Sequence, residues 1–283
     1  HLHEPLAPYL PLAVLQSSQS TNIGTFHAFH GSTRLYRLSS PVLKHWFNRL
    51  DGRIAVSPAA HSHVRRFFPA NYEIIPNGID LDFFGSTVDP IKEFIDDKIN
   101  ILFLGRLEKR KGLRYLLEAY GNLQWEFPNI RLIVVGPGNP DRYCYRILGE
   151  RNLRNVVFAG NVSYEMLPRY YRTADIFCSP ATGKESFGIV LLEAMAAAKA
   201  IVATRIEGYS HIIRHGYQGL LVPPKDGKAL SEAIAILIRN PDLRMKMGLQ
   251  GKDFVNCYKW ESVAKQVVNY YETTMKRSNG SKS

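Results

Sequence analysis

The chain has 283 residues, of which 45% are hydrophobic and 22% are charged. That length predicts about two domains, and the composition excludes a wholly disordered, collagen-like or low-complexity protein. Lys and Arg number 36 against 25 Asp and Glu, which gives a formal net charge of +11. Such a charge favours a partner that carries phosphate groups, whether nucleic acid, anionic lipid or nucleotide, and does not choose among them.

The three cysteines, Cys144, Cys178 and Cys257, are too few and too scattered for a disulfide framework or a metal site. They favour a reducing compartment, and we expect a cytoplasmic protein. No run of about 20 apolar residues is present, so we expect no membrane-spanning helix. The opening H-L-H-E-P-L-A-P has no basic stretch of a signal peptide and no initiator Met, from which we expect a fragment or a processed chain.

Residues 1–97 are predicted to form an α/β domain that ends in a linker. The expected strands are Ile23–Phe26, Arg53–Val56 and Glu73–Ile75, and the expected helices are Ala7–Gln16, Ser40–Leu50 and Pro58–Phe68. Three strands make a thin sheet with an exposed edge, so we expect part of this domain to be absent from the chain. Gly85, Pro90 and mixed charge indicate an interdomain linker over Leu81–Asp97.

Residues 98–256 alternate short apolar runs with segments of helical spacing. The expected strands are Asn100–Leu104, Ile130–Val135, Val156–Ala159, Asp175–Cys178, Ala200–Ala203 and Gly219–Val222. Strands buried on both faces and separated by helices are typical of a doubly wound parallel sheet. Ligands bind such sheets beyond the carboxyl ends of the strands. Residues 257–283 are predicted to form a last helix, Trp260–Lys276, and a polar tail.

The first candidate site is the loop G-R-L-E-K-R-K-G, Gly105 to Gly112, which follows a predicted strand and opens a helix. It holds four cations, and its glycines let the backbone approach a ligand closely. Arg grips a phosphate through two hydrogen bonds, and Lys adds a point charge. The alternative is a solvated basic loop without a ligand.

The second candidate is E-S-F-G-I-V-L-L-E, Glu185 to Glu193. Gly188 is expected at a helix N-terminus, where amide groups bind phosphate. Glu193 lies in an otherwise apolar helix, where a carboxylate needs a partner, and the hydroxyls of a sugar would provide one. The alternative is a Glu that pairs with a Lys or points outward.

Two further segments are candidates. In G-T-F-H-A-F-H, Gly24 to His30, His27 follows a strand and suits acid–base chemistry or a sugar contact, whereas the two histidines are weak support for a metal. An ordinary loop histidine is the alternative. Arg34 to Leu50 mixes basic and aromatic residues, as does a helix that lies on an anionic membrane. A helix packed on a core with basic outer residues explains that segment equally.

Taken together, G-R-L-E-K-R-K-G, V-V-G-P-G, P-N-G-I-D and E-S-F-G-I-V-L-L-E-A-M-A-A resemble the family-4 retaining glycosyltransferases of GT-B fold. With H-E-P and then T-F-H near the start, the chain resembles phosphatidylinositol mannosyltransferases. The resemblance runs from His3 to about Tyr271. It implies two Rossmann-like domains with a cleft between them, the second for the nucleotide-sugar and the first for the acceptor, and a last helix that crosses back to the first.

The resemblance also implies residue roles. Arg106 and Lys111 would hold the diphosphate, Glu185 would contact the transferred sugar, and His27 would contact the donor sugar and be needed for transfer. The other implied donor-binding residues are Gly105, Gly136, Val162, Phe187, Gly188, Ile189 and Glu193, with Gly136 and Val162 near the base and Glu193 on the ribose.

The implied function is transfer of a hexose, mannose from GDP-mannose, to a hydroxyl of a lipid such as phosphatidylinositol at a membrane surface. We expect no metal and no cofactor, because no ligand cluster is present, and no nucleic-acid partner, because the basic residues gather at strand ends. A UDP-sugar donor with a soluble acceptor is one alternative. A truncated, inactive nucleotide-binding chain is another, because the family's opening glycine loop is missing. Ala198 replaces the family's usual Gly, a packing change only.

Overall fold

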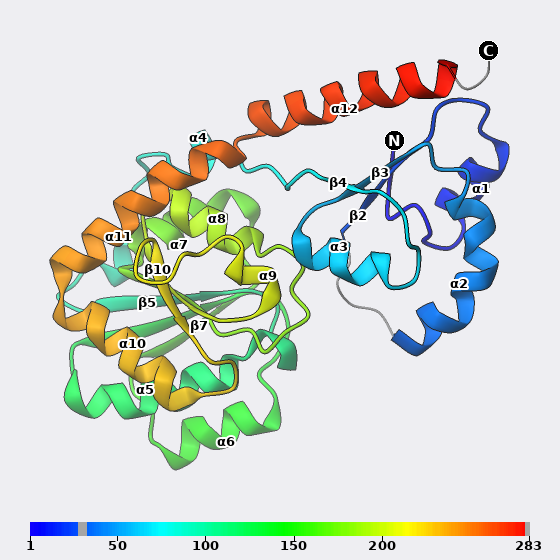
Figure 1. The fold of residues 1–283 in the computed structure, drawn as a ribbon. Coiled ribbons are helices and arrows are strands. Elements are labelled where there is room, and N and C mark those ends of the chain that lie inside the picture. The colour runs from blue at the N-terminus through cyan, green and yellow to red at the C-terminus, as the bar shows by residue number, and fades with distance from the viewer. Residues whose placement is uncertain (28–32, 281–283) are drawn as a thin grey trace. The chain divides into compact units, whose positions relative to one another are not determined.

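The computed structural model describes residues 1–27 and 33–280, with the side chains of residues 33–36, 279 and 280 left out. The chain forms two compact units, each built on a parallel sheet (Figure 1). The first unit comprises residues 1–78, 184–187 and 258–283, and the second comprises residues 79–183 and 188–257. The predicted α/β class with two Rossmann-like regions is confirmed.

The first unit holds a four-stranded sheet in the order β1-β2-β3-β4. Its elements are β1 (Leu2–His3), α1 (Leu10–Ser17), β2 (Ile23–Phe26), α2 (Thr33–Phe47), β3 (Gly52–Ala55), α3 (Pro58–Arg65), β4 (Glu73–Ile74) and α12 (Trp260–Gly280). The prediction of three strands was therefore wrong. The missed strand β1 has two residues and exists through its pairing with β2.

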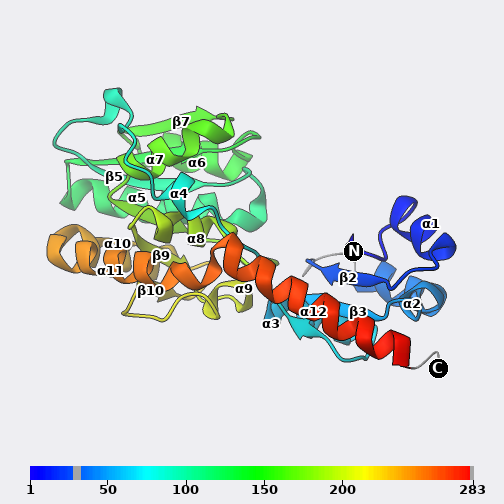
Figure 2. The ribbon, with the colours of Figure 1, turned by 90° about the horizontal axis from the view of Figure 1, so that it is seen from above.

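The long helix α12 packs on the sheet of the first unit, as Figure 2 shows beside β3. Val263 of this helix lies in one apolar cluster with Ile23 and Ile54. The hydroxyl of Tyr270 accepts a hydrogen bond from the Arg53 amide at 2.8 Å and donates one to the Arg53 carbonyl at 3.2 Å. The chain thus leaves the first unit at residue 78, contributes residues 184–187 to it, and returns to it at residue 258.

The second unit holds a six-stranded parallel sheet in the order β10-β9-β8-β5-β6-β7. Its strands are β5 (Ile99–Leu104), β6 (Ile130–Val135), β7 (Val156–Gly160), β8 (Ile176–Ser179), β9 (Ala200–Thr204) and β10 (Gly219–Val222). This is the strand order of the dinucleotide-binding fold. The first three strands of the unit, β5 to β7, follow one another toward one edge of the sheet, and the next three, β8 to β10, follow one another toward the other edge, so the switch point lies between β5 and β8.

Helices cover both faces of this sheet (Figure 1). They are α4 (Leu81–Phe84), α5 (Leu113–Glu126), α6 (Arg142–Glu150), α7 (Leu167–Thr173), α8 (Ile189–Ala196), α9 (Glu207–Ser210), α10 (Gly227–Arg239) and α11 (Pro241–Phe254). Helix α5 packs against α6 and α10, whereas α4 packs against α7 and α8. The strands β5, β6, β8, β9 and β10 are almost wholly buried, which explains their continuous apolar sequences, whereas the edge strand β7 is partly exposed.

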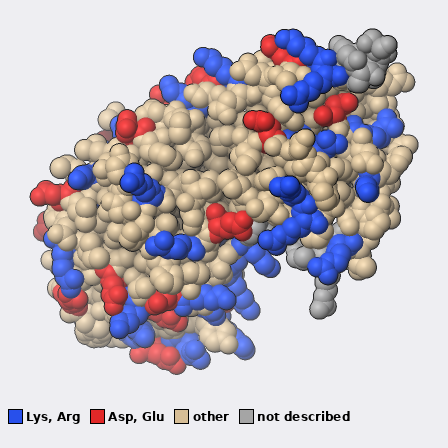
Figure 3. All heavy atoms as spheres, viewed as in Figure 1, with Lys and Arg blue, Asp and Glu red and all other residues tan. Residues whose placement is uncertain are grey.

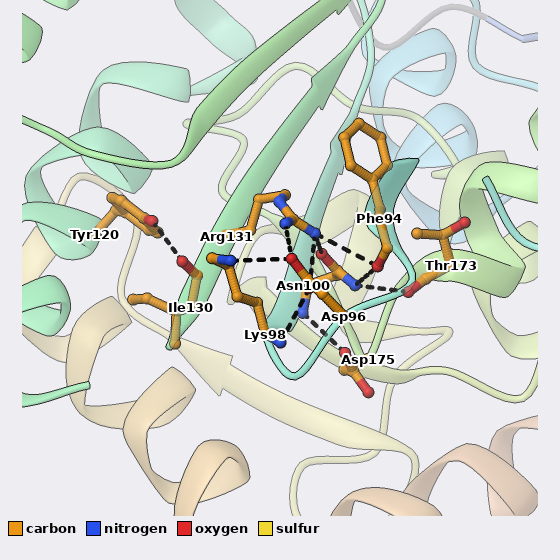
Figure 4. Close-up of polar contacts among 9 residues, drawn as sticks. All are labelled: Phe94, Asp96, Lys98, Asn100, Tyr120, Ile130, Arg131, Thr173 and Asp175. Carbon is orange, nitrogen blue, oxygen red and sulfur yellow. Dashed lines mark hydrogen bonds and ion pairs between the residues drawn. The ribbon is translucent and has the colours of Figure 1, made fainter. Parts of the chain in front are cut away.

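A buried polar cluster holds the amino ends of β5 and β6 (Figure 4). Arg131, only 7% exposed, donates to the Asn100 side-chain oxygen at 3.0 Å and pairs with Asp96. Its guanidinium also lies over the Phe94 ring, 5.0 Å from the centroid. These contacts hold residues 94–96 to the second sheet. Residues 81–97, predicted as a linker at the end of the first domain, belong to the second unit.

Candidate donor site

The carboxyl ends of β5 and β8 form the switch point of the second sheet, where two loops meet. One runs from Gly105 to Gly112, and the other begins at Pro180. The Thr182 amide donates to the Arg110 carbonyl at 2.7 Å, which joins the two loops. Open α/β sheets bind ligands at this position, because the neighbouring crossovers leave in opposite directions there.

Close packing between these loops requires glycine at residue 112. Gly112 has a left-handed backbone with φ of 76°, and a Cβ built on it would lie 1.9 Å from the Pro180 carbonyl oxygen. A second glycine, Gly136 after β6, lies equally close to the Gly105 carbonyl, at 2.1 Å from an added Cβ. The backbones of three strand-end loops therefore touch without side chains between them.

Two arginines of the loop Gly105 to Gly112 form ion pairs with the same carboxylate. Glu108 pairs with the Arg106 Nε at 3.0 Å and with the Arg110 Nε at 2.8 Å. Slight burial alone would raise the pKa of Glu108, but the Arg110 hydrogen bond and the nearby cations hold it below its usual value. Arg106 is 62% exposed, so it has room to exchange this surface ion pair for a ligand phosphate at little cost.

Helix α8 begins at Ile189, and the preceding Gly188 is its N-cap, with a left-handed φ of 84° and no side-chain hydrogen bond to the helix. A Cβ on Gly188 would lie 2.7 Å from the ring of Tyr209, so the turn into the helix needs glycine. The next residue, Ile189, is exposed at the first turn. The amide groups and the dipole of a helix attract anions at its start, as the sequence predicted for this position.

Glu193 lies one turn into α8 and is 7% exposed. The Tyr171 hydroxyl donates to its Oε2 at 2.7 Å, and no residue that the structure describes donates to Oε1. Burial raises the pKa of Glu193 to about 6, while the Tyr171 hydrogen bond and the charge of Lys111 pull it down. The carboxylate is therefore neither outward-pointing nor paired with Lys111 alone, and a hydroxyl donor would satisfy its second oxygen.

Sequence reasoning missed two tyrosines around this carboxylate. Tyr171 is fully buried in α7 and orients Glu193. Tyr164, 55% exposed, follows β7 two residues after the predicted base contact Val162 and stacks on Phe83 with ring centroids 4.8 Å apart. The negative charge of Glu193 contributes to the raised pKa of Tyr164, after burial, so the two groups are neighbours.

The remaining predicted residues, His27, Glu185 and Phe187, belong to the first unit. His27 follows β2, and its amide donates to the Glu4 carboxylate at 2.6 Å. The Ser57 hydroxyl donates to the Ser186 carbonyl, between Glu185 and Phe187. Of the predicted donor-binding set, the second unit contains Gly105, Arg106, Lys111, Gly136, Val162, Gly188, Ile189 and Glu193.

The segment predicted to contact a membrane forms α2, whose described side chains divide between two environments. Trp46 and Phe47 pack into the core, whereas Leu38 and Val42 are 76% and 65% exposed. His30 lies outside the described residues, as do the side chains of residues 33–36. On the face that Figure 3 shows, acidic residues are interspersed with basic ones over the second unit.

Within the described ranges, no helix is long and apolar enough to cross a bilayer. The described residues also contain no group of three His, Cys, Asp or Glu side chains arranged to hold a metal ion. All three cysteines are unpaired thiols, with Cys144 and Cys178 buried and Cys257 exposed.

Comparison with known families identifies both parts of the chain. Residues 87–254 match the family of glycosyl transferases group 1, and residues 1–83 match Glycosyltransferase Family 4. The chain belongs to the group 1 glycosyl transferases. It is a glycosyltransferase of GT-B fold, as the motifs predicted.

Individual relatives of this glycosyltransferase support the same assignment. It is 34% identical to the phosphatidyl-myo-inositol mannosyltransferase of Mycobacterium leprae over all of this chain and 74% of that protein. A protein of the same name from Mycolicibacterium smegmatis is 32% identical over 96% of this chain and 70% of that one.

Two solved structures share the fold. Sucrose-phosphate synthase from Thermosynechococcus elongatus matches with a TM-score of 0.77 and 26% identity, over 94% of this chain and 70% of that chain. Anabaena HepE in complex with UDP matches with a TM-score of 0.80 and 18% identity, over 90% of this chain and 73% of that chain.

Proposed function

We propose that this glycosyltransferase moves mannose from GDP-mannose to a hydroxyl of phosphatidylinositol, with retention of configuration. The observation that carries the proposal is the buried Glu193, held by Tyr171 and within the field of Lys111 at the switch point. A carboxylate beside a cation suits a ribose next to a diphosphate. The whole-chain similarity to phosphatidyl-myo-inositol mannosyltransferases supports the choice of sugar and acceptor.

Charge development explains why these residues suit the reaction. The bond between the anomeric carbon and the phosphate oxygen breaks through an oxocarbenium-like state, and negative charge grows on the departing diphosphate. In our proposal Arg106, Lys111 and the start of α8 at Gly188 stabilise that charge. The acceptor hydroxyl attacks from the face that the diphosphate leaves, and its proton passes to the leaving phosphate.

The remaining assignments concern the donor sugar and the base. Glu185 and His27 would contact the sugar, the backbone of Phe187, Gly188 and Ile189 would line sugar and phosphate, and Gly105, Gly136 and Val162 would line the nucleotide. Neither metal nor cofactor has a step in this scheme.

A membrane acceptor is supported by the outer surface of the first unit. Exposed apolar side chains lie on α1, on the residue before it and on α2, and α2 also carries exposed basic residues. They are Tyr9, Leu10, Val14, Leu38 and Val42, with Arg37 and Lys44. Apolar residues next to cations are typical of proteins that lie on anionic membranes, and each such cation is worth about 1 kcal/mol near the surface. We propose a peripheral location on the inner face of the cell membrane.

The test is a transfer assay with radiolabelled GDP-mannose and vesicles that contain phosphatidylinositol. We expect labelled lipid with the wild type, and none with Lys111→Ala or Glu185→Ala when both variants are folded. Lys109→Ala is the matched control, because it removes the same charge from an exposed position of the same loop, which our assignment leaves out of phosphate binding. Near-full transfer by Lys111→Ala would refute the assigned role.

A donor panel separates the alternatives. Turnover of UDP-glucose with a soluble acceptor, and none of GDP-mannose, would replace the proposed donor and acceptor. Nucleotide binding without turnover of any donor would mean an inactive nucleotide-binding chain.

A further inference from the structure

Two imidazoles meet at the carboxyl ends of β1 and β2 in the first unit. The Nδ1 of His3 lies 2.7 Å from the Nε2 of His27, a hydrogen-bond distance. The rings are stacked, with centroids 5.0 Å apart and planes 27° from parallel. His3 belongs to the H-L-H-E-P opening, to which the proposed function gives no role.

The local backbone explains why the two rings meet. His3 pairs with Thr25 in the parallel register of β1 and β2, and His27 follows two residues later. The chain then turns at Glu4, whose φ is 52°. Its amide donates to the Thr25 carbonyl at 2.8 Å, and its carboxylate accepts from the His27 amide at 2.6 Å. Both the main chain and the ring of His27 are therefore held by the H-E pair.

A hydrogen bond between two neutral imidazoles contains one proton, so it couples the tautomers of both rings. His3 occupies the Nε2 atom of His27, so the Nδ1 atom of His27 is the nitrogen that remains for a ligand. Among the described residues, none forms a hydrogen bond with this Nδ1. Burial, and then the nearby His3, hold the pKa of His27 below 6.5. A second proton on the pair would place two like charges in contact.

Other titratable groups surround the pair. On either side of β1, the His1 ring lies 4.6 Å from the His3 ring, and the Glu4 carboxylate accepts a hydrogen bond from the His27 amide. From α12, the Tyr271 hydroxyl hydrogen-bonds to His1 and not to either member of the pair. The carboxylate of Glu4 thus faces the His27 main chain, while His3 is the group that contacts its ring.

We propose that His3 is a positioning residue, which fixes the tautomer of His27 and keeps that ring neutral while its Nδ1 contacts the donor sugar. This inference rests on the proposed function of His27. His3 itself touches no reacting atom. The role explains why a histidine follows Leu2 directly at the end of β1, where any exposed polar residue would serve the fold.

The kinetic test compares His3→Ala with His3→Asn, because the Asn amide places a hydrogen-bonding atom where Nδ1 of His3 lies and carries no titrating charge. We expect His3→Ala to lower kcat roughly tenfold, the effect of one lost hydrogen bond. His3→Asn should restore most of that loss at pH 8. In both variants the acidic limb of the kcat profile should move to higher pH, because the charge that lowers the pKa of His27 is gone. Binding of GDP should not change.

A spectroscopic readout keeps the inference testable without turnover. Long-range 1H–15N NMR spectra report the tautomer and the pKa of each histidine. We expect one tautomer for His27 in the wild type, a mixture in His3→Ala, and one tautomer again in His3→Asn. The same tautomer mixture and pKa in all three proteins would overturn the inference even if the enzyme proved active.

A His27→Ala variant separates the two proposals. Loss of transfer in His27→Ala, with unchanged activity and pH profile in His3→Ala, would overturn the positioning role and leave the proposed function intact. Full transfer by His27→Ala would refute the assigned role of His27 and the positioning role with it, whereas the donor assignment to the second unit would stand.

Discussion

The buried Glu193 should reduce the stability of the enzyme at neutral pH. Its pKa is raised from an ordinary 4.5 to about 6, so the folded protein prefers the protonated carboxyl. The protonated Glu193 carboxyl therefore stabilises the folded state fully below pH 4.5, and this stabilisation is lost as the pH rises through 6. A shift of this size corresponds to ~2 kcal/mol in total, of which about 1 kcal/mol falls between pH 5 and pH 8.

The perturbation is Glu193→Gln, which keeps an oxygen for the Tyr171 hydroxyl and removes the charge. We expect the stability of the variant relative to the wild type to increase by about 1 kcal/mol from pH 5 to pH 8, measured by urea unfolding. Glu232→Gln, at an exposed position of α10, is the control and should show no such change. A relative stability of Glu193→Gln that is equal at both pH values would refute the argument that an ionised carboxylate is buried here. Nucleotide affinity should fall in the same variant.

Three further predictions concern single side chains. Tyr171→Phe removes the hydrogen bond to the Glu193 carboxylate, and a hydrogen bond to a charged group contributes roughly 1.5–3 kcal/mol. The pKa of Glu193 should therefore rise by ~1–2. GDP binding, measured by calorimetry, should weaken at pH 7, where the carboxyl is then partly protonated, and recover by pH 9. Gly112→Ala should cost more than ~2 kcal/mol in urea unfolding, because its Cβ would overlap the Pro180 carbonyl, whereas Gly149→Ala, with nothing within 4 Å, should be neutral or stabilising. Tyr270→Phe should cost ~1–2 kcal/mol and speed hydrogen exchange in α12, and unchanged exchange would contradict the anchoring role of its hydroxyl.

Strand positions were predictable where burial on both faces leaves an apolar run. β2, β6 and β10 have the predicted bounds. Strand β1 was missed because two residues carry no periodicity, and only its partner β2 makes it a strand. Helix α2 begins at Thr33, before the predicted Ser40, and it continues through Pro41, a residue that usually ends or bends a helix. The strand order requires long-range pairing that no local pattern contains.

The phosphate-binding loops were recognisable because glycine and clustered charge are local signals. The partners of the site were not. Tyr171 is 22 residues from Glu193, and His3 is 24 residues from His27, so each pair forms only through the tertiary fold. Glu108 lies within the motif, but its pairing with Arg106 and Arg110 depends on the turn of the loop, which the order of the residues does not show.

The proposed function depends above all on one interaction: the second unit binds a diphosphate at the switch point, and Lys111 contacts that diphosphate. Calorimetric titration of GDP and GMP, and of UDP and UMP, into the wild type and Lys111→Ala tests it most directly. The account predicts that the diphosphate of the preferred base binds at least tenfold more tightly than its monophosphate, and that Lys111→Ala removes most of this difference. Equal affinity for diphosphate and monophosphate in the wild type, or a difference that Lys111→Ala leaves unchanged, would contradict it.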